Sequence, residues 1–257
     1  MIIDVNANLS RWPFRRTPCD ELPPLIEKYR AYDVQQAWVG SLDGLFHRDM
    51  GDVNRRLAEA CRHEQRVKLL PFGSINPLLP DWQEDLRRCA EEYRMPGIRL
   101  HPNYHGYKLD EPLAAELLDL AAQRGLIVQL ALRMEDIRVQ HRLMRIPDVD
   151  ATPLGALVAA RPGLRLVLLN SMSTLHDQEL RGLAAVDRIW FEIGMREGVG
   201  GVARLIQVVP WARVLFGSHV PLFSLESAVL KIREAGLEGP QQQAIEHENA
   251  QRLLAGR

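Results

Sequence analysis

The chain has 257 residues, of which 46% are apolar and 25% are charged, a composition typical of a folded domain and unlike that of a disordered segment. With 32 basic and 33 acidic residues the formal net charge is -1, so no overall positive charge is available to attract nucleic acid or an anionic membrane. No apolar run approaches the roughly 18 to 20 residues needed to cross a bilayer, and we expect no membrane span.

Eight short apolar or β-branched runs follow one another along the chain and predict strands. They lie at residues 2–6, 34–40, 66–73, 97–101, 126–132, 164–170, 188–194 and 213–218. Segments with helical periodicity lie between several of them. These segments include residues 52–65, 81–94, 112–125, 152–163 and 224–236, and residues 239–257 are expected to form a C-terminal helix.

Local signals mark where several of these helices begin and end. Asp52 and Asp81 are the expected N-caps of their helices, because an aspartate side chain can accept a hydrogen bond from a free backbone N–H group. Gly125, Gly163 and Gly236 stand just past the helix ends, where a left-handed backbone conformation is common.

The alternation of strands and helices predicts parallel strands joined by right-handed crossovers. Eight such units in a chain of this length indicate an α/β fold, a (β/α)8 TIM barrel formed by residues 1–257 as a single domain and closed by the C-terminal helix. A doubly wound open sheet is the competing fold, but no glycine-rich nucleotide loop follows any strand. The glycines at residues 198–201 are only a weak candidate for an anion contact.

Three cysteines, Cys19, Cys61 and Cys89, are widely spaced and form no C-x-x-C motif, which predicts reduced thiols. Polar residues begin at Asp4, so the first residues lack the apolar core of a signal peptide. We therefore expect a cytoplasmic protein.

Polar residues gather at the predicted carboxyl ends of the strands, where a TIM barrel carries its catalytic groups. They are Asn6, Asn8, Ser41, Asp43, Ser74, Asn76, His101, Arg133, Glu135, Asn170, Ser171, Glu192, Ser218 and His219. Asn6 and Asn8 are two residues apart, so both side chains point the same way if the strand is regular.

Four stretches of the chain resemble the amidohydrolase-related family, the metal-dependent hydrolases and decarboxylases of the amidohydrolase superfamily. They are IIDVNAN at residues 2–8, GIRLHPNYHGYKLDEP at 97–112, RVLFGSHVP at 213–221 and IEHENAQRLLA at 245–255. They occur in the family's order and span nearly the whole chain. The resemblance implies the TIM-barrel fold.

The resemblance also implies a divalent metal site, and the chain departs from the family pattern at each expected ligand. Asn6 and Asn8 replace the two histidines of the first strand, Ala131 and Asn170 replace those of the fifth and sixth, and His219 replaces the aspartate that serves as ligand and base. Asparagine is a weak ligand for zinc, and no carboxylate remains to balance a dication. We therefore expect no metal and no other cofactor.

Without a metal to activate water, the chain needs another base. His219 stands where the family base belongs, and an ordinary histidine pKa near 6.5 suits that role. His101 is the second candidate, although a histidine before a proline equally fits a structural strand end. Arg99, Lys108 and Arg133 are candidate partners of a carboxylate or an oxyanion. His101 and His105 are four residues apart, but a loop with Pro102 and Gly106 is not expected to form a helix face that binds metal.

Other polar residues are candidates for substrate binding. Asn6, Asn8, Asn170 and Glu192 are expected to orient the substrate, but the amides could equally only bond to one another. Arg11 follows the first strand together with Trp12 and Phe14. These three residues form a candidate aromatic wall with a cation, or simply pack.

The loop at residues 132–150 is long for this fold and rich in both charges, as expected of a lid or binding element. Arg133 and Glu135 are its main candidates for contact with a polar or anionic substrate. A solvated loop or an oligomer contact is the alternative.

Three functions stay open. The first is a hydrolase or decarboxylase that acts on a small polar or carboxylated molecule without a metal. The second is a catalytically inactive barrel that binds a ligand or a partner. The third is a conventional metal-dependent hydrolase in which Asn6, Asn8, Asn170 and His219 hold a cation. The expected partner is a small molecule, not nucleic acid or a membrane, and a homo-oligomer is left open.

Overall fold

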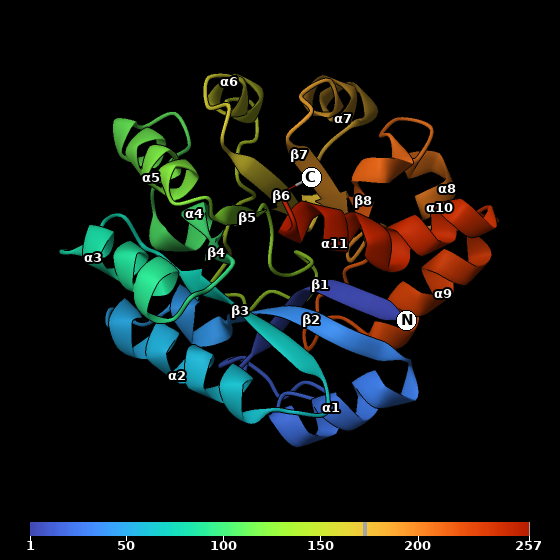
Figure 1. Ribbon diagram of the computed structural model, residues 1–257, viewed down its shortest axis with the longest axis horizontal. Coiled ribbons are helices and arrows are strands. Elements are labelled where there is room, and N and C mark those ends of the chain that lie inside the picture. The colour runs from blue at the N-terminus through green and yellow to red at the C-terminus, as the bar shows by residue number, and fades with distance from the viewer. Residues whose placement is uncertain (172–173, 257) are drawn as a thin grey trace.

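The computed structural model describes residues 1–171 and 174–256 as one barrel of eight parallel strands surrounded by helices (Figure 1). The strands pair in chain order from β1 to β8. They are β1 (Ile2–Leu9), β2 (Val34–Ser41), β3 (Lys68–Ser74), β4 (Gly97–Leu100), β5 (Ile127–Ala131), β6 (Arg165–Leu169), β7 (Ile189–Glu192) and β8 (Val214–Leu215). The (β/α)8 barrel predicted from the alternation of elements is confirmed.

β8 is shorter than predicted, and the residues after it close the barrel against β1. The Val5 N–H group donates to Phe216 O at 2.9 Å, and the Asn8 N–H group donates to Val220 O at 2.8 Å. Between these two bonds His219 donates its N–H group to Asn6 O at 2.7 Å. The segment that follows β8 is therefore fixed by backbone bonds to the strand that carries the two asparagines.

Helices surround the strands in Figure 1. They are α1 (Leu22–Ala31), α2 (Met50–His63), α3 (Trp82–Arg87), α4 (Pro102–His105), α5 (Pro112–Gln123), α6 (Leu154–Ala159), α7 (Asp177–Ala184), α8 (Gly201–Leu205), α9 (Leu225–Glu234), α10 (Gly239–Gln243) and α11 (Asn249–Leu254). Short 3-10 turns, η1 (Leu42–Leu45) and η4 (Trp211–Arg213), and π-helical turns, η2 (Arg88–Glu92) and η5 (Ala244–Glu248), complete the described elements. Within the described ranges, no helix combines the length and apolar character required of a membrane span.

Three local predictions differ from the structure. Asp49, not Asp52, caps α2, because the Asp49 carboxylate accepts the Asp52 N–H group at 2.9 Å. Asp81 is the N-cap residue of α3, as predicted, but its side chain makes no cap bond. The predicted loop after His101 is instead one helical turn, α4, because Pro102 suits the first position of a helix and Gly106 ends it with a φ of 83°.

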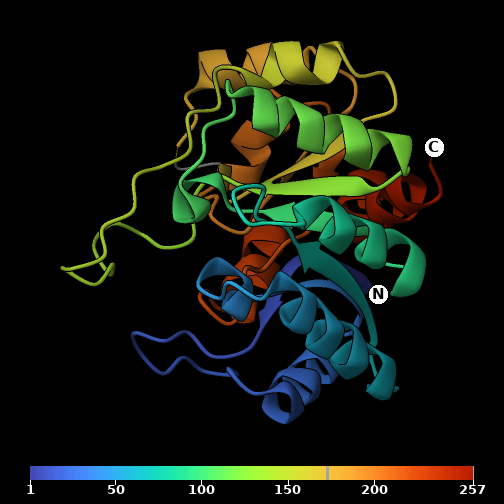
Figure 2. The same cartoon turned by 90° about the vertical axis from the view of Figure 1, so that its left-hand side faces the viewer.

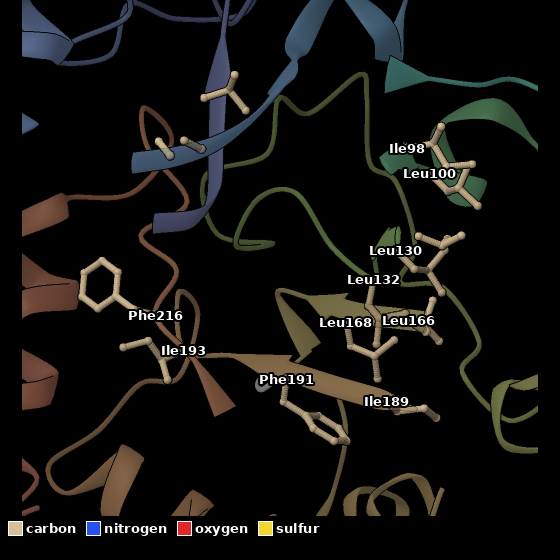
Figure 3. Close-up of a cluster of buried hydrophobic side chains, with 14 of the residues drawn as sticks. Ile98, Leu100, Leu130, Leu132, Leu166, Leu168, Ile189, Phe191, Ile193 and Phe216 are labelled. Atoms are coloured by element: carbon tan, nitrogen blue, oxygen red, sulfur yellow. The ribbon is translucent and has the colours of Figure 1, made fainter. Parts of the chain in front are cut away.

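Apolar side chains form two layers. The outer layer packs the strands against the helices, and Figure 3 shows its part at β4 to β8, with Leu130, Leu166 and Phe191 among the labelled residues. The inner layer fills the barrel and includes Val5 and Trp38. Burial of both faces explains why the strands read as continuous apolar runs in the sequence.

A shift of register in β1 positions the two asparagines. Asp4 pairs with Ala37 of β2, but Ala7 pairs with Val39, so β1 has one extra residue at this point. Ile3, before the shift, belongs to the inner layer, whereas Ala7, four residues later and after the shift, belongs to the outer layer. The alternation of inward and outward side chains along β1 is thus reversed after the shift. The side chains at positions 6 and 8 therefore turn toward the interior at the carboxyl end of the barrel.

The predicted C-terminal helix is present and continuous through α10, η5 and α11, with a π-helical turn at its middle, and it packs on the opposite end of the barrel. Asn249 donates to Val214 O at 2.7 Å, and Arg165, the first residue of β6, donates to Leu253 O at 2.7 Å. The segments after β1 and β5 extend from the barrel on the same side in Figure 2. The carboxyl ends of the strands therefore lie beneath these loops, as the site prediction requires.

Candidate functional site

Five buried residues at the carboxyl ends of the strands form what we call the mouth cluster: Asn6, Asn8, His101, Asn170 and His219. Each has at most 1% of its surface exposed. They come from β1, from the residues that follow β4 and β6, and from the segment after β8. The structure therefore brings together the residues that the sequence proposed for catalysis and for amide contacts.

A chain of hydrogen bonds fixes the orientation of three members. Asn170 donates its Nδ2 group to Arg133 O at 2.7 Å, so its Oδ1 atom is left to accept from Asn6 Nδ2 at 2.9 Å. His219 Nε2 lies 2.7 Å from Met134 O and must carry the proton, because a carbonyl only accepts. His219 Nδ1 is then the lone-pair nitrogen, and it lies 3.4 Å from Asn170 Nδ2.

Asn170 and His219 both have a left-handed backbone, with φ values of 57° and 59°. Asparagine tolerates this conformation, whereas for histidine it is uncommon and costs energy. Such strained residues are found most often at binding and catalytic sites. The strain therefore supports a functional role for the residues at the carboxyl ends of β6 and β8.

His219 differs from its expected behaviour as a base. Burial is the main cause that lowers the pKa of His219 to about 4; the bond to Met134 O acts against this fall, and the positive charges of Arg99 and Lys231 add to it. The prediction of a pKa near 6.5 is therefore not met, because the sequence could not show that the imidazole is removed from water. His219 is neutral at physiological pH, with Nε2 committed to the protein.

His101 has no bonding partner among the described residues on either ring nitrogen. Its ring meets that of His105 edge to face, with centroids 6.0 Å apart, and His105 Nε2 itself bonds to Gly44 O at 2.8 Å. Burial, followed by the charges of His105, Arg99 and His219, places the pKa of His101 well below its ordinary value. A neutral imidazole offers one donor and one acceptor, and in His101 both are uncommitted within the described protein.

Arg99 crosses the barrel interior beneath this cluster. Its Nη1 group donates to Asn8 Oδ1 at 2.8 Å and to Ala7 O at 2.7 Å, its Nε group donates to Gln129 Oε1 at 2.8 Å, and its Nη2 group donates to Trp38 O at 3.3 Å. Arg99 is 1% exposed. From the sequence, Arg99 was only one of three candidate cations. Its position two residues before His101 on the same strand indicated that both side chains point the same way.

The bond from Arg99 also orients Asn8. A guanidinium only donates, so Asn8 must present Oδ1 to it and keep Nδ2 free to donate elsewhere. Neither Asn8 Nδ2 nor Asn6 Oδ1 has a partner in the described residues. The mouth cluster thus presents a donor, an acceptor and the neutral imidazole of His101, all buried.

The buried carboxylate of Glu192 supports the backbone. Glu192 accepts the N–H groups of Asn170 at 2.6 Å and Gly194 at 2.5 Å, one on each oxygen. Burial raises the pKa of Glu192, and these two bonds act against that rise. Gly217 makes room for the carboxylate, since a Cβ atom there would lie 2.2 Å from Glu192 Oε2. Glu192 thus positions the backbone at residues 170 and 194, and its expected contact with substrate stays a prediction.

Three further candidates lie outside the mouth cluster. Arg11 is solvent-exposed and pairs with Glu21, so it supplies no cation to the buried site. The Arg133 side chain pairs with Asp148 within the loop after β5, with Nε and Oδ1 2.6 Å apart. Glu135 is buried and pairs with Arg15; burial raises its pKa, and the guanidinium lowers it.

Aromatic side chains from segments that follow the carboxyl ends of three strands pack against one another. Trp12 lies 5.6 Å from Phe14, 5.6 Å from Phe46 and 6.3 Å from Tyr104, measured between ring centroids. These four residues, which we call the aromatic cap, come from the segments after β1, β2 and β4, and His141 of the long loop stacks on Phe14. The residues of the predicted aromatic wall, Trp12 and Phe14, therefore pack against other aromatic side chains. A separate cavity of about 480 Å³ lies beside it, lined by residues that include Asn103, Tyr107, Lys108 and Asp148.

The residues at the inherited metal position do not fit a dication. Asn8 Oδ1 is bonded to Arg99, Asn170 Oδ1 to Asn6, and His219 Nε2 to Met134 O. In residues 1–171 and 174–256, no three His, Cys, Asp or Glu side chains are grouped so that they could hold a metal ion. A divalent cation at this position would have no anionic ligand and would lie near the Arg99 charge.

Comparison with known proteins gives the family. Residues 45–255 match the family model described as Amidohydrolase, which covers most of the chain. The chain belongs to the amidohydrolase family. No curated protein matches it significantly.

Solved structures of this family have the same barrel. An uncharacterised TIM-barrel protein from Bordetella bronchiseptica superposes with a TM-score of 0.77 at 17% identity, over 100% of this chain and 99% of that one. A 5-carboxyvanillate decarboxylase from Sphingomonas paucimobilis gives 0.73 at 14% identity, over 99% and 98%. A dihydroxybenzoic acid decarboxylase from Polaromonas sp., with bound manganese and the inhibitor 2-nitroresorcinol, gives 0.73 at 14%, over 100% and 97%. At these identities the likeness shows the fold and leaves the chemistry to the site.

Proposed function

We propose that this amidohydrolase-family protein is a hydrolase or decarboxylase that acts on a small polar or carboxylated molecule without a divalent metal. The observation that carries the proposal is the set of buried polar atoms without partners in the described protein: both ring nitrogens of His101, Asn6 Oδ1 and Asn8 Nδ2. Buried polar groups are almost always hydrogen-bonded, so such a set at the carboxyl end of a barrel favours a bound polar molecule.

The orientations of the side chains suggest a role for each group. In hydrolysis His101 takes a proton from the attacking water, because both of its ring nitrogens are uncommitted within the described protein; its lowered pKa makes it a weak base. Asn8 Nδ2 donates to the oxygen on which negative charge develops, and Asn6 Oδ1 holds a substrate hydroxyl or water. His219, through Asn170, keeps the amide of Asn6 in the required orientation. The names of the structural neighbours favour decarboxylation as much as hydrolysis.

A catalytically inactive barrel that binds a ligand is the second candidate. The aromatic cap and the lowered pKa of His219 favour it, because a closed site with neutral, weakly basic histidines binds without needing to react. Both the enzyme and the inactive barrel would bind a small molecule, but only the enzyme would convert it to product.

The test is a screen for hydrolysis and decarboxylation of small esters, lactones, amides and aromatic acids, with metal content measured by elemental analysis. We expect activity that survives chelation and falls by about a hundredfold or more in His101→Asn. His63→Asn, at an exposed position on α2, is the matched control and should keep the wild-type rate. Stoichiometric zinc or loss of activity on chelation would reject the metal-independent mechanism. Ligand binding without any turnover would support the inactive barrel.

A further inference from the structure

Arg99 is a buried cation whose direct partners are all neutral. Its four hydrogen bonds go to two backbone carbonyls, one asparagine and one glutamine. Gln129 is itself fixed, since its Nε2 group donates to Val5 O at 2.7 Å. Gly40 makes room for the guanidinium, because a Cβ atom at that position would lie 2.9 Å from Arg99 Cδ and Nη1. The chain therefore holds this charge rigidly.

The charge of Arg99 is not cancelled by contact. Asp4 and Glu192 act on it at longer range and raise its pKa, but neither carboxylate is among the hydrogen-bond partners of the guanidinium. Burial lowers the pKa of Arg99 only to about 10, so the guanidinium stays protonated at neutral pH. Its charge also reaches His101 and His219, whose pKa values it lowers.

We infer that Arg99 makes the mouth cluster selective for a carboxylate, by supplying a fixed positive charge and by turning the Nδ2 group of Asn8 toward the ligand. A carboxylate at this position would accept from Asn8 Nδ2 and from the N–H group of His101, and its charge would balance the guanidinium in a region that excludes water. The inference rests on the proposed function, which puts the substrate in the mouth cluster, and it adds the substrate class and a specificity-determining residue. Arg99 is a positioning residue, because it acts through its charge and through Asn8.

Binding of matched pairs of probes tests this inference without any need for turnover. Acetate and acetamide, and benzoate and benzamide, differ in charge while keeping similar shape. Isothermal titration at pH 7.5 should show that the wild-type protein prefers each carboxylate over its amide by about tenfold or more, the size of effect expected when a buried charge is balanced. Equal binding of acid and amide, or no binding of any carboxylate, would overturn the inference.

Variants assign the preference to Arg99. Arg99→Met should abolish it and Arg99→Lys should retain part of it, because lysine keeps the charge. Arg213→Met is the matched control: Arg213, like Arg99, donates to neutral groups, the backbone carbonyls of Val186 and Ala184, but it precedes β8 at the opposite end of the barrel. Persistence of the preference in Arg99→Met, or its equal loss in Arg213→Met, would refute the role of Arg99.

A second variant covers the case in which Arg99→Met fails to fold. Asn8→Asp keeps the shape of the side chain and places a carboxylate against Arg99 Nη1, so it should fold and lose the preference for acids. Retained preference in Asn8→Asp would count against the inference. Selective carboxylate binding without turnover would reject the proposed enzyme and leave this inference intact, and turnover of neutral substrates alone would do the reverse.

Discussion

Acid sensitivity of folding should depend on His219 more than on any exposed histidine. The folded protein holds the pKa of this side chain at about 4, compared with an ordinary 6.5, chiefly because the ring is fully buried. Between these values the unfolded chain binds a proton that the folded chain does not, so the free energy of unfolding must fall as the pH is lowered. The contribution of His219 is complete above pH 6.5 and is lost progressively down to about pH 4.

The magnitude follows from the size of the shift. At about 1.4 kcal/mol per pH unit, a pKa lowered from 6.5 to about 4 corresponds to a loss of roughly 3 kcal/mol on acidification. His101 acts in the same direction, whereas the raised pKa values of Asp4 and Glu192 act in the opposite direction. The pH dependence of the wild-type free energy of unfolding alone therefore does not isolate His219. The quantity to measure is the difference in this pH dependence between the wild type and a His219 variant.

His219→Asn is the suitable variant, because asparagine accepts a left-handed backbone and its side chain does not titrate. Urea denaturation at pH values from 7.5 to 4.5 gives the free energy of unfolding of each protein. We expect the wild type to lose about 2 to 3 kcal/mol more than His219→Asn over this range, while His63→Asn keeps the wild-type slope. Parallel pH profiles for wild type and His219→Asn would show that the buried imidazole is not held neutral by the fold.

Two further substitutions test how the buried polar network is held. Gly40→Ala should lower the free energy of unfolding by about 1 to 3 kcal/mol, because the added methyl group meets the fixed Arg99 side chain. Gly155→Ala in α6 is the control and should be neutral or slightly stabilising, because the space around Gly155 is open. Equal urea midpoints for the two variants would contradict this packing. Asp4→Asn should lower the free energy of unfolding by about 2 to 3 kcal/mol. The Asp4 carboxylate accepts both the N–H and the hydroxyl group of Ser218, whereas an amide presents a donor to one of them. An unchanged thermal denaturation midpoint would show that these bonds contribute little.

Much of the fold can be read from the sequence because it depends on local and periodic features. Apolar runs of strand length, separated by segments of helical period, specify parallel strands covered on both faces, and eight of them in this chain length specify the barrel. The same pattern places Asn6, His101 and Asn170 at the carboxyl ends of their strands, so their gathering follows once the barrel is known. The presence of asparagine at positions 6, 8 and 170, where the family resemblance implies histidine, is likewise a property of the sequence alone.

What the sequence could not decide depends on contacts between distant residues. The extra residue in β1 that turns Asn6 and Asn8 inward is defined only by the pairing with β2, and Arg99 is a central cation only because β4 faces β1 across the barrel. The pKa of His219 follows from removal of its ring from water, which local sequence does not encode. Periodicity determined where the polar groups lie along each strand, whereas burial and partners, which exist only in the closed barrel, determined their charge and orientation.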